Sequence, residues 1–119
     1  MKTGITFIAF DHLHAGYISM LEEAKSQCDY LIVGLQTNPN NKKDYKVLTP
    51  KSLVERYIQL NACKYVDEIV PYITDQDLED IMCSFNIDVR IIGEEYKGKN
   101  FTAKSYCLKK GIEIYYNKR

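Results

Sequence analysis

Five short apolar runs alternate with amphipathic segments along the chain, and this alternation is the strongest constraint on its fold. The runs lie at 5–10, 29–36, 68–70, 88–93 and 112–116. Short continuous apolar runs bounded by turn residues are typical of strands that are buried on both faces. The segments between them place apolar side chains at helical spacing. Strict alternation of strand and helix predicts an α/β fold, in which a parallel sheet is covered by helices on both faces.

A chain of 119 residues suits one domain, so we interpret residues 1–119 as a single nucleotide-binding domain. We expect a Rossmann-like arrangement of five parallel strands in the order 3-2-1-4-5. Ligands bind such sheets at the carboxyl edge, where the strand order reverses. That point lies between the first and fourth strands, so the turn around His14 and the loop that begins at Gly93 should open into the same crevice.

Local signals predict where the helices begin and end. Thr49-Pro50 offers an N-cap hydroxyl and a first-turn proline to a helix that ends near Ala62. The run Thr74-Asp75-Gln76-Asp77 resembles a capping box, with aspartate in place of the usual glutamate or glutamine. Gly111 should stop the last helix. The polar stretch 37–48 is expected to form a loop at the carboxyl edge of the sheet.

The composition narrows the range of partners and compartments. Sixteen basic and sixteen acidic side chains cancel, so we expect no nucleic acid or membrane partner, and any anion site must be local. The four cysteines are widely spaced and form no CxxC pair, which argues against a zinc site, and no resident metal site is expected. Reduced thiols and the lack of a signal peptide predict a cytoplasmic location.

The stretch Thr6–Tyr17 is the most informative local feature, since it is typical of a strand that enters a tight turn and then a helix. The first N–H groups of a helix have no internal partners and carry partial positive charge, so such a junction favours anions. His14 and Tyr17 are three residues apart and would project from one side of the first turn. We interpret the junction as a nucleotide-phosphate site. The alternative interpretation of Asp11 is that it only caps the turn, and His12 is expected to be an exposed turn residue.

Motifs along nearly the whole chain resemble those of the small cytidylyltransferases. That family begins with Gly-Thr-Phe-Asp followed shortly by His-x-Gly-His, and the corresponding residues here are Ile8-Ala9-Phe10-Asp11 and His14-Ala15-Gly16-Tyr17. Further matches, in the same order as in the family, are Asp29–Val33, Glu55-Arg56, Lys64–Pro71, Asn86–Val89 and Gly93–Lys99.

The resemblance implies transfer of CMP from CTP, with Mg²⁺, to a small phosphorylated alcohol such as glycerol-3-phosphate, with release of pyrophosphate. It also implies a homodimer. The residues that it implies for catalysis are His14, Tyr17 and Lys46. Those that it implies for the nucleotide are Ile8, Ala9, Phe10, Asp11, His14, Gly16, Gly93 and Glu95. Those that it implies for the acceptor phosphate are Arg56 and Lys64.

Three departures from the family pattern fall on the chemistry. Tyr17 replaces the second histidine of the signature, and a phenol carries no positive charge near neutral pH. Ile8-Ala9 replace Gly-Thr, so a side chain fills the space where the nucleotide approaches the backbone. The family motif Arg-Thr-x-Gly-Ile-Ser-Thr-Thr does not follow the fifth strand. Two hypotheses therefore stand: a CTP-dependent nucleotidyltransferase, or a weakened or inactive relative that acts as a nucleotide-binding or partner module.

Overall fold

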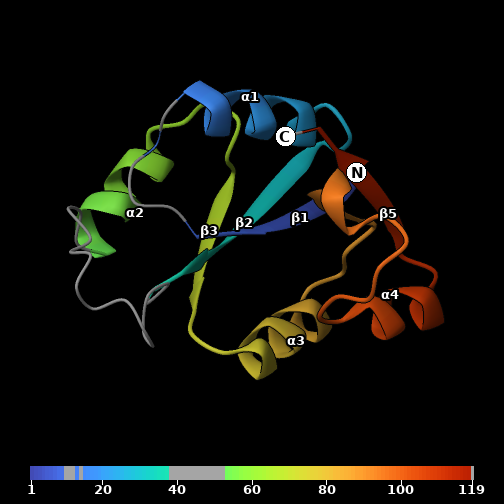
Figure 1. Ribbon diagram of the computed structural model, residues 1–119. Helices are drawn as coiled ribbons and strands as arrows, with labels where there is room; N and C mark the ends of the chain where they lie inside the picture. Colours follow the sequence, from blue (N-terminus) through green and yellow to red (C-terminus); the bar gives the residue numbers. More distant parts are fainter. Residues whose placement is uncertain (10–12, 14, 38–52, 119) are drawn as a thin grey trace.

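The computed structural model describes residues 1–9, 13, 15–37 and 53–118, and Figure 1 shows their arrangement. The strands are β1 (Thr3–Ile8), β2 (Tyr30–Gln36), β3 (Glu68–Tyr72), β4 (Val89–Gly93) and β5 (Glu113–Asn117). The helices are α1 (Ala15–Lys25), α2 (Leu53–Asn61), α3 (Asp75–Ser84), the 3₁₀ turn η1 (Glu94–Tyr96) and α4 (Lys104–Lys110). The predicted Thr49-Pro50 helix start and most of the predicted 37–48 loop lie outside these residues.

The five strands form one parallel sheet in the order β3-β2-β1-β4-β5, which confirms the predicted topology. β1 pairs with β2 along its whole length, from Thr3 opposite Tyr30 to Ile8 opposite Leu35. Its pairing with β4 stops much earlier, at Ile5 opposite Arg90. Strands β1 and β4 therefore separate toward their carboxyl ends, which opens the sheet at the switch point.

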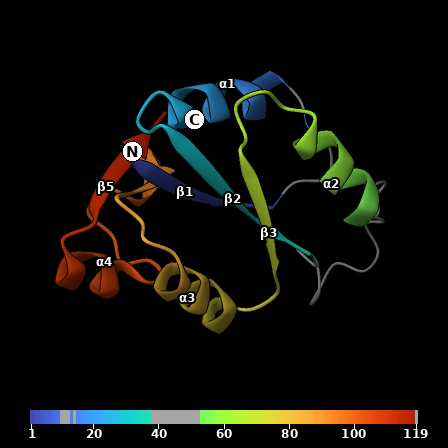
Figure 2. The same cartoon turned by 180° about the vertical axis from the view of Figure 1, so that it is seen from behind.

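Two apolar cores lie on opposite faces of the sheet because successive strand residues point to opposite sides. Leu31 faces α1 and α2 and packs in one cluster with Leu21 and Leu60. Ile32 faces α3 and α4 and packs in the other cluster with Met82. Figures 1 and 2 show α1 and α2 on one side of the sheet and α3 and α4 on the other. Within the described residues, no helix is long and apolar enough to cross a membrane.

Local signals for the helix ends are largely confirmed. The Thr74 hydroxyl accepts from the Asp77 N–H at 3.1 Å, and the Asp77 carboxylate accepts from the Thr74 N–H at 3.1 Å, so the capping box is complete. Gly111 ends α4 with φ of 74°. The last helix begins at Lys104, after Ala103, which adopts a left-handed conformation with φ of 70°.

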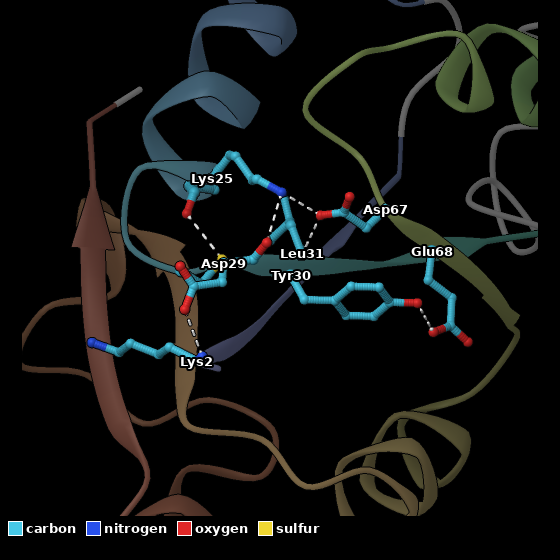
Figure 3. Close-up of polar contacts among 9 residues, drawn as sticks. Lys2, Lys25, Asp29, Tyr30, Leu31, Asp67 and Glu68 are labelled. Atoms are coloured by element: carbon cyan, nitrogen blue, oxygen red, sulfur yellow. Dashed lines mark hydrogen bonds and ion pairs between the residues drawn. The ribbon is translucent and has the colours of Figure 1, made fainter.

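A polar network closes the amino edge of the sheet (Figure 3). The Asp67 carboxylate accepts from Lys25 Nζ at 2.5 Å and from the Leu31 N–H at 2.8 Å. Lys25 Nζ also donates to the Asp29 carbonyl at 2.9 Å. Burial alone would raise the pKa of Asp67, but the bonds from Lys25 and Leu31 outweigh it and lower that pKa. These bonds join the end of α1 to the starts of β2 and β3.

Candidate functional site at the carboxyl edge

A cavity of about 330 Å³ lies where β1 and β4 separate. The end of β1 and the first turn of α1 form one side of it, and β4, η1 and the segment before α4 form the other. Residues from the end of β3 and from α3 complete it. The lining residues are Phe7, Ile8, Ala9, Tyr17, Tyr72, Leu78, Arg90, Ile91, Ile92, Glu95, Tyr96, Phe101 and Thr102.

The β1 side of the cavity depends on a glycine in the neighbouring strand. Phe7 lies opposite Gly34 in the β1–β2 pairing. A Cβ atom at Gly34 would come within 2.3 Å of Phe7 Cδ1, so the phenyl ring occupies the space that a side chain would need. The ring meets Tyr72 edge to face, with a centroid distance of 5.5 Å and an interplanar angle of 85°. Because Gly34 has no side chain, the Phe7 ring can occupy this space and form an aromatic wall of the cavity.

Tyr17 joins the start of α1 to the end of β1. Its hydroxyl donates to the Ala9 carbonyl at 3.2 Å, and both residues line the cavity. Ile8 also lines the cavity, and it is 4% exposed within the core cluster beneath α1 and α2. The backbone N–H of Leu13 donates to Gln59 Oε1 at 3.1 Å, which ties the β1–α1 turn to α2. Tyr17 thus has its polar end at the wall of the cavity.

Of the other residues predicted to bind the nucleotide, some line the cavity and some do not. Gly93 is buried at the end of β4, where it pairs with Asn117 of β5. Glu95 lies in η1 and lines the cavity, and Gly16 lies in the first turn of α1. The structure therefore brings four predicted residues, Ile8, Ala9, Tyr17 and Glu95, around one cavity. Phe10, Asp11, His14 and Lys46 lie outside the described residues.

The two basic residues predicted for the acceptor phosphate are not among those that line the cavity. Arg56 is 3% exposed, and it donates from Nη1 to the Gln36 carbonyl at 2.8 Å and from Nη2 to the Thr37 carbonyl at 2.9 Å. It thereby joins α2 to the end of β2. Lys64 is exposed, with its ammonium 5.3 Å from the centroid of the Tyr65 ring. A phosphate-binding role for either residue stays a prediction.

Arg90 is the charged residue of the cavity lining that sequence reasoning missed. Its side chain is 4% exposed, and the guanidinium carbon lies 5.1 Å from the centroid of the Phe7 ring and 5.0 Å from that of Phe101. Nη1 donates to the Thr102 carbonyl. Burial lowers the pKa of Arg90, while Cys107 and Tyr72 act in the opposite direction, and an arginine with its high intrinsic pKa still carries its charge. The signal in the sequence was a charged residue inside an otherwise apolar central strand.

Comparisons with known proteins agree on the fold and the family. The family model described as cytidylyltransferase-like matches residues 8–110. The glycerol-3-phosphate cytidylyltransferase of Bacillus subtilis (strain 168) is 36% identical over 107 residues, which cover 90% of this chain and 82% of the relative. A probable ethanolamine-phosphate cytidylyltransferase of Encephalitozoon cuniculi is 42% identical over 73 residues, which cover 57% of this chain and 22% of the relative. A solved structure, that of the lipopolysaccharide core biosynthesis protein of Thermoplasma volcanium GSS1, has a TM-score of 0.76 and 21% identity, and covers 99% of this chain and 95% of that one.

Proposed function

The chain belongs to the cytidylyltransferase-like family, and we propose that it transfers CMP from CTP to a small phosphorylated alcohol such as glycerol-3-phosphate, with release of pyrophosphate. The observation that carries this proposal is the family match, which runs from the end of β1 to the last residue of α4. The position of the cavity supports it, because that cavity lies at the switch point of a parallel sheet, where such folds bind their ligands.

In the proposed reaction, a phosphate oxygen of the acceptor attacks the α-phosphorus of CTP in line with the leaving group. The new bond joins the acceptor oxygen to that phosphorus, and the bond between the phosphorus and the bridging oxygen of pyrophosphate breaks. Little covalent work falls to the protein, which must hold two anions together and stabilise the developing charge. We assign the nucleotide phosphates to the β1–α1 junction, with His14 and Tyr17 as donors and Lys46 as a further cation.

We propose that Mg²⁺ enters with CTP, where it would neutralise charge on the phosphate oxygens. Mg²⁺ in such sites is held by one or two carboxylates together with the substrate phosphates. Among the described residues that line the cavity, Glu95 supplies a carboxylate, and no cluster of three metal-binding side chains is found in the described part of the chain. This donor set fits a metal that is held chiefly by the triphosphate. We also propose that the protein acts as a homodimer in the cytoplasm.

The proposal is tested by measuring pyrophosphate release from CTP and Mg²⁺ over a panel of phosphorylated alcohols that includes glycerol-3-phosphate. We expect release that depends on the acceptor. A calorimetric titration with CTP, run in parallel, separates the two hypotheses that the sequence left open. CTP binding without turnover on any acceptor would identify a binding module, and the absence of both binding and turnover would refute the proposed function.

Substitutions at Tyr17 test how the site works. If the phenol is a weaker substitute for an imidazole, Tyr17→His raises the rate, by up to roughly 10²-fold, the usual loss when one preorganised donor is removed. Tyr17→Phe, the matched control, removes only the hydroxyl and should lower the rate. Equal rates for the wild type and both variants would place Tyr17 outside the chemistry.

A further inference from the structure

We propose that Arg90 determines which acceptor the cavity admits. It would donate hydrogen bonds to the oxygen atoms of the phosphorylated alcohol, and its charge would exclude acceptors that carry an ammonium group. This inference rests on the proposed function, since it concerns the acceptor of that same reaction. It assigns a specificity role to a residue for which neither the motifs nor the comparisons suggested one.

The hydrogen bonding of Arg90 is incomplete in the described structure. A guanidinium has five N–H donors that lie in one plane. Nη1 donates to the Thr102 carbonyl and the Cys107 side chain lies within hydrogen-bonding reach of the guanidinium, whereas Nε is buried and has no hydrogen-bond partner among the described residues. Within the same residues, no carboxylate forms an ion pair with Arg90. A buried charge that lacks such partners is costly, so a ligand that supplies acceptor oxygens gains by binding beside it.

The aromatic rings restrict where those oxygens must lie. The Phe7 and Phe101 rings are each about 5 Å from the guanidinium, at 5.1 and 5.0 Å. These cation–π contacts stabilise the charge but accept no N–H bonds in the guanidinium plane. The cavity of about 330 Å³ beside Arg90 has room for a small polar group. Hydroxyl, carboxylate or phosphate oxygens would satisfy the in-plane donors.

The same arrangement disfavours a cationic ligand. Aromatic walls such as Phe7, Tyr72 and Phe101 would by themselves suit an ammonium group. In this chain the position between two of those rings is already taken by the guanidinium of Arg90. A second cation would meet the like charge of the guanidinium, and such repulsion is an effective means of rejecting a ligand. Glycerol-3-phosphate has a neutral hydroxyl arm, whereas ethanolamine-phosphate has an ammonium arm.

The experiment compares glycerol-3-phosphate and phosphoethanolamine as acceptors, through kcat/KM where there is turnover and through Kd in the presence of CTP and Mg²⁺ otherwise. The wild-type protein should prefer glycerol-3-phosphate by at least about 10-fold. Arg90→Met removes the charge and should reduce that preference by about 10-fold or more, mainly through KM. Lys104→Met is the matched control, because the Lys104 ammonium lies 5.5 Å from the Phe101 ring centroid but does not line the cavity. It should leave the preference unchanged.

A conservative variant keeps the test decisive if Arg90→Met does not fold. Arg90→Lys retains the charge and loses the planar fork, so it should bind glycerol-3-phosphate more weakly and still reject phosphoethanolamine. A wild type that accepts both compounds equally, or an Arg90→Lys variant that gains phosphoethanolamine, would overturn the inference. CTP binding distinguishes failure of this inference from failure of the proposed function. An Arg90→Met variant that binds CTP and keeps the wild-type preference refutes the role of Arg90, whereas absence of CTP binding by the wild type refutes the proposed function itself.

Discussion

Replacement of Gly34 by alanine should both destabilise the protein and disturb the cavity. Gly34 is in β2, directly opposite Phe7, and the added Cβ would lie 2.3 Å from Cδ1 and 2.7 Å from Cε1 of that ring. Ordinary contacts of a Cβ atom begin near 3.4 Å. The ring must therefore move by roughly 1 Å to restore normal packing, since close-packed interiors do not tolerate such overlap.

The size of the effect follows from how the ring is held. Phe7 is packed against Tyr72 on one side and lies 5.1 Å from the Arg90 guanidinium carbon, so it cannot move without disturbing these contacts. Overpacking of this kind costs about 1–3 kcal/mol. For a domain of 119 residues, this corresponds to a melting temperature lower by about 4–12 °C. The affinity for the acceptor should fall as well, because Phe7 forms the wall beside Arg90.

Urea unfolding and calorimetry measure the stability, and titration with glycerol-3-phosphate in the presence of CTP measures the site. Asp67→Asn is a suitable control, because the Asp67 carboxylate bonds Lys25 and the Leu31 N–H at the amino edge of the sheet and does not line the cavity. It should lower the stability and leave the acceptor affinity unchanged. In the double variant Phe7→Leu/Gly34→Ala the clashing ring is absent, so the two effects on stability should not add.

Two results would refute this account. One is a Gly34→Ala variant as stable as the wild type, which would mean that the sheet or the ring adapts at no cost. The other is strict additivity of the Phe7→Leu and Gly34→Ala effects, which would show that the cost of the alanine does not come from the Phe7 ring.

Two further substitutions test the framework that holds the site. Asp67→Asn removes the ion pair with Lys25 and weakens the bond from the Leu31 N–H, at a cost of about 1.5–3 kcal/mol near neutral pH. Because folding lowers the pKa of Asp67, its contribution is complete above the unfolded value near 3.9 and is lost as the pH falls through the folded value, so urea unfolding of the two proteins should converge below about pH 4. Thr74→Ala removes the N-cap of α3 and should lower the free energy of unfolding by about 1 kcal/mol; an unchanged urea midpoint would show that the capping box contributes nothing.

The sequence by itself predicted the α/β fold, the strand order and the family. These features depend on signals that lie within a few residues of one another: apolar runs, helical spacing, the Thr74 capping box and the Gly111 stop. It also pointed to the carboxyl edge between the first and fourth strands, because strand order alone locates a switch point. The family motifs supplied Ile8, Ala9, Tyr17 and Glu95, which line the cavity there.

Only the tertiary structure decided what the cavity is made of. The β1–β4 pairing ends at Ile5 and Arg90, and that register is set by contacts between segments far apart in the chain. The same contacts place Arg90 between Phe7 and Phe101, and no local pattern marks these three residues as neighbours. The environment of Arg56 could not be predicted from the sequence either, since its burial against the end of β2 follows from how α2 packs. Local propensity is encoded within a few residues, whereas the environment of a charge is created by the whole fold.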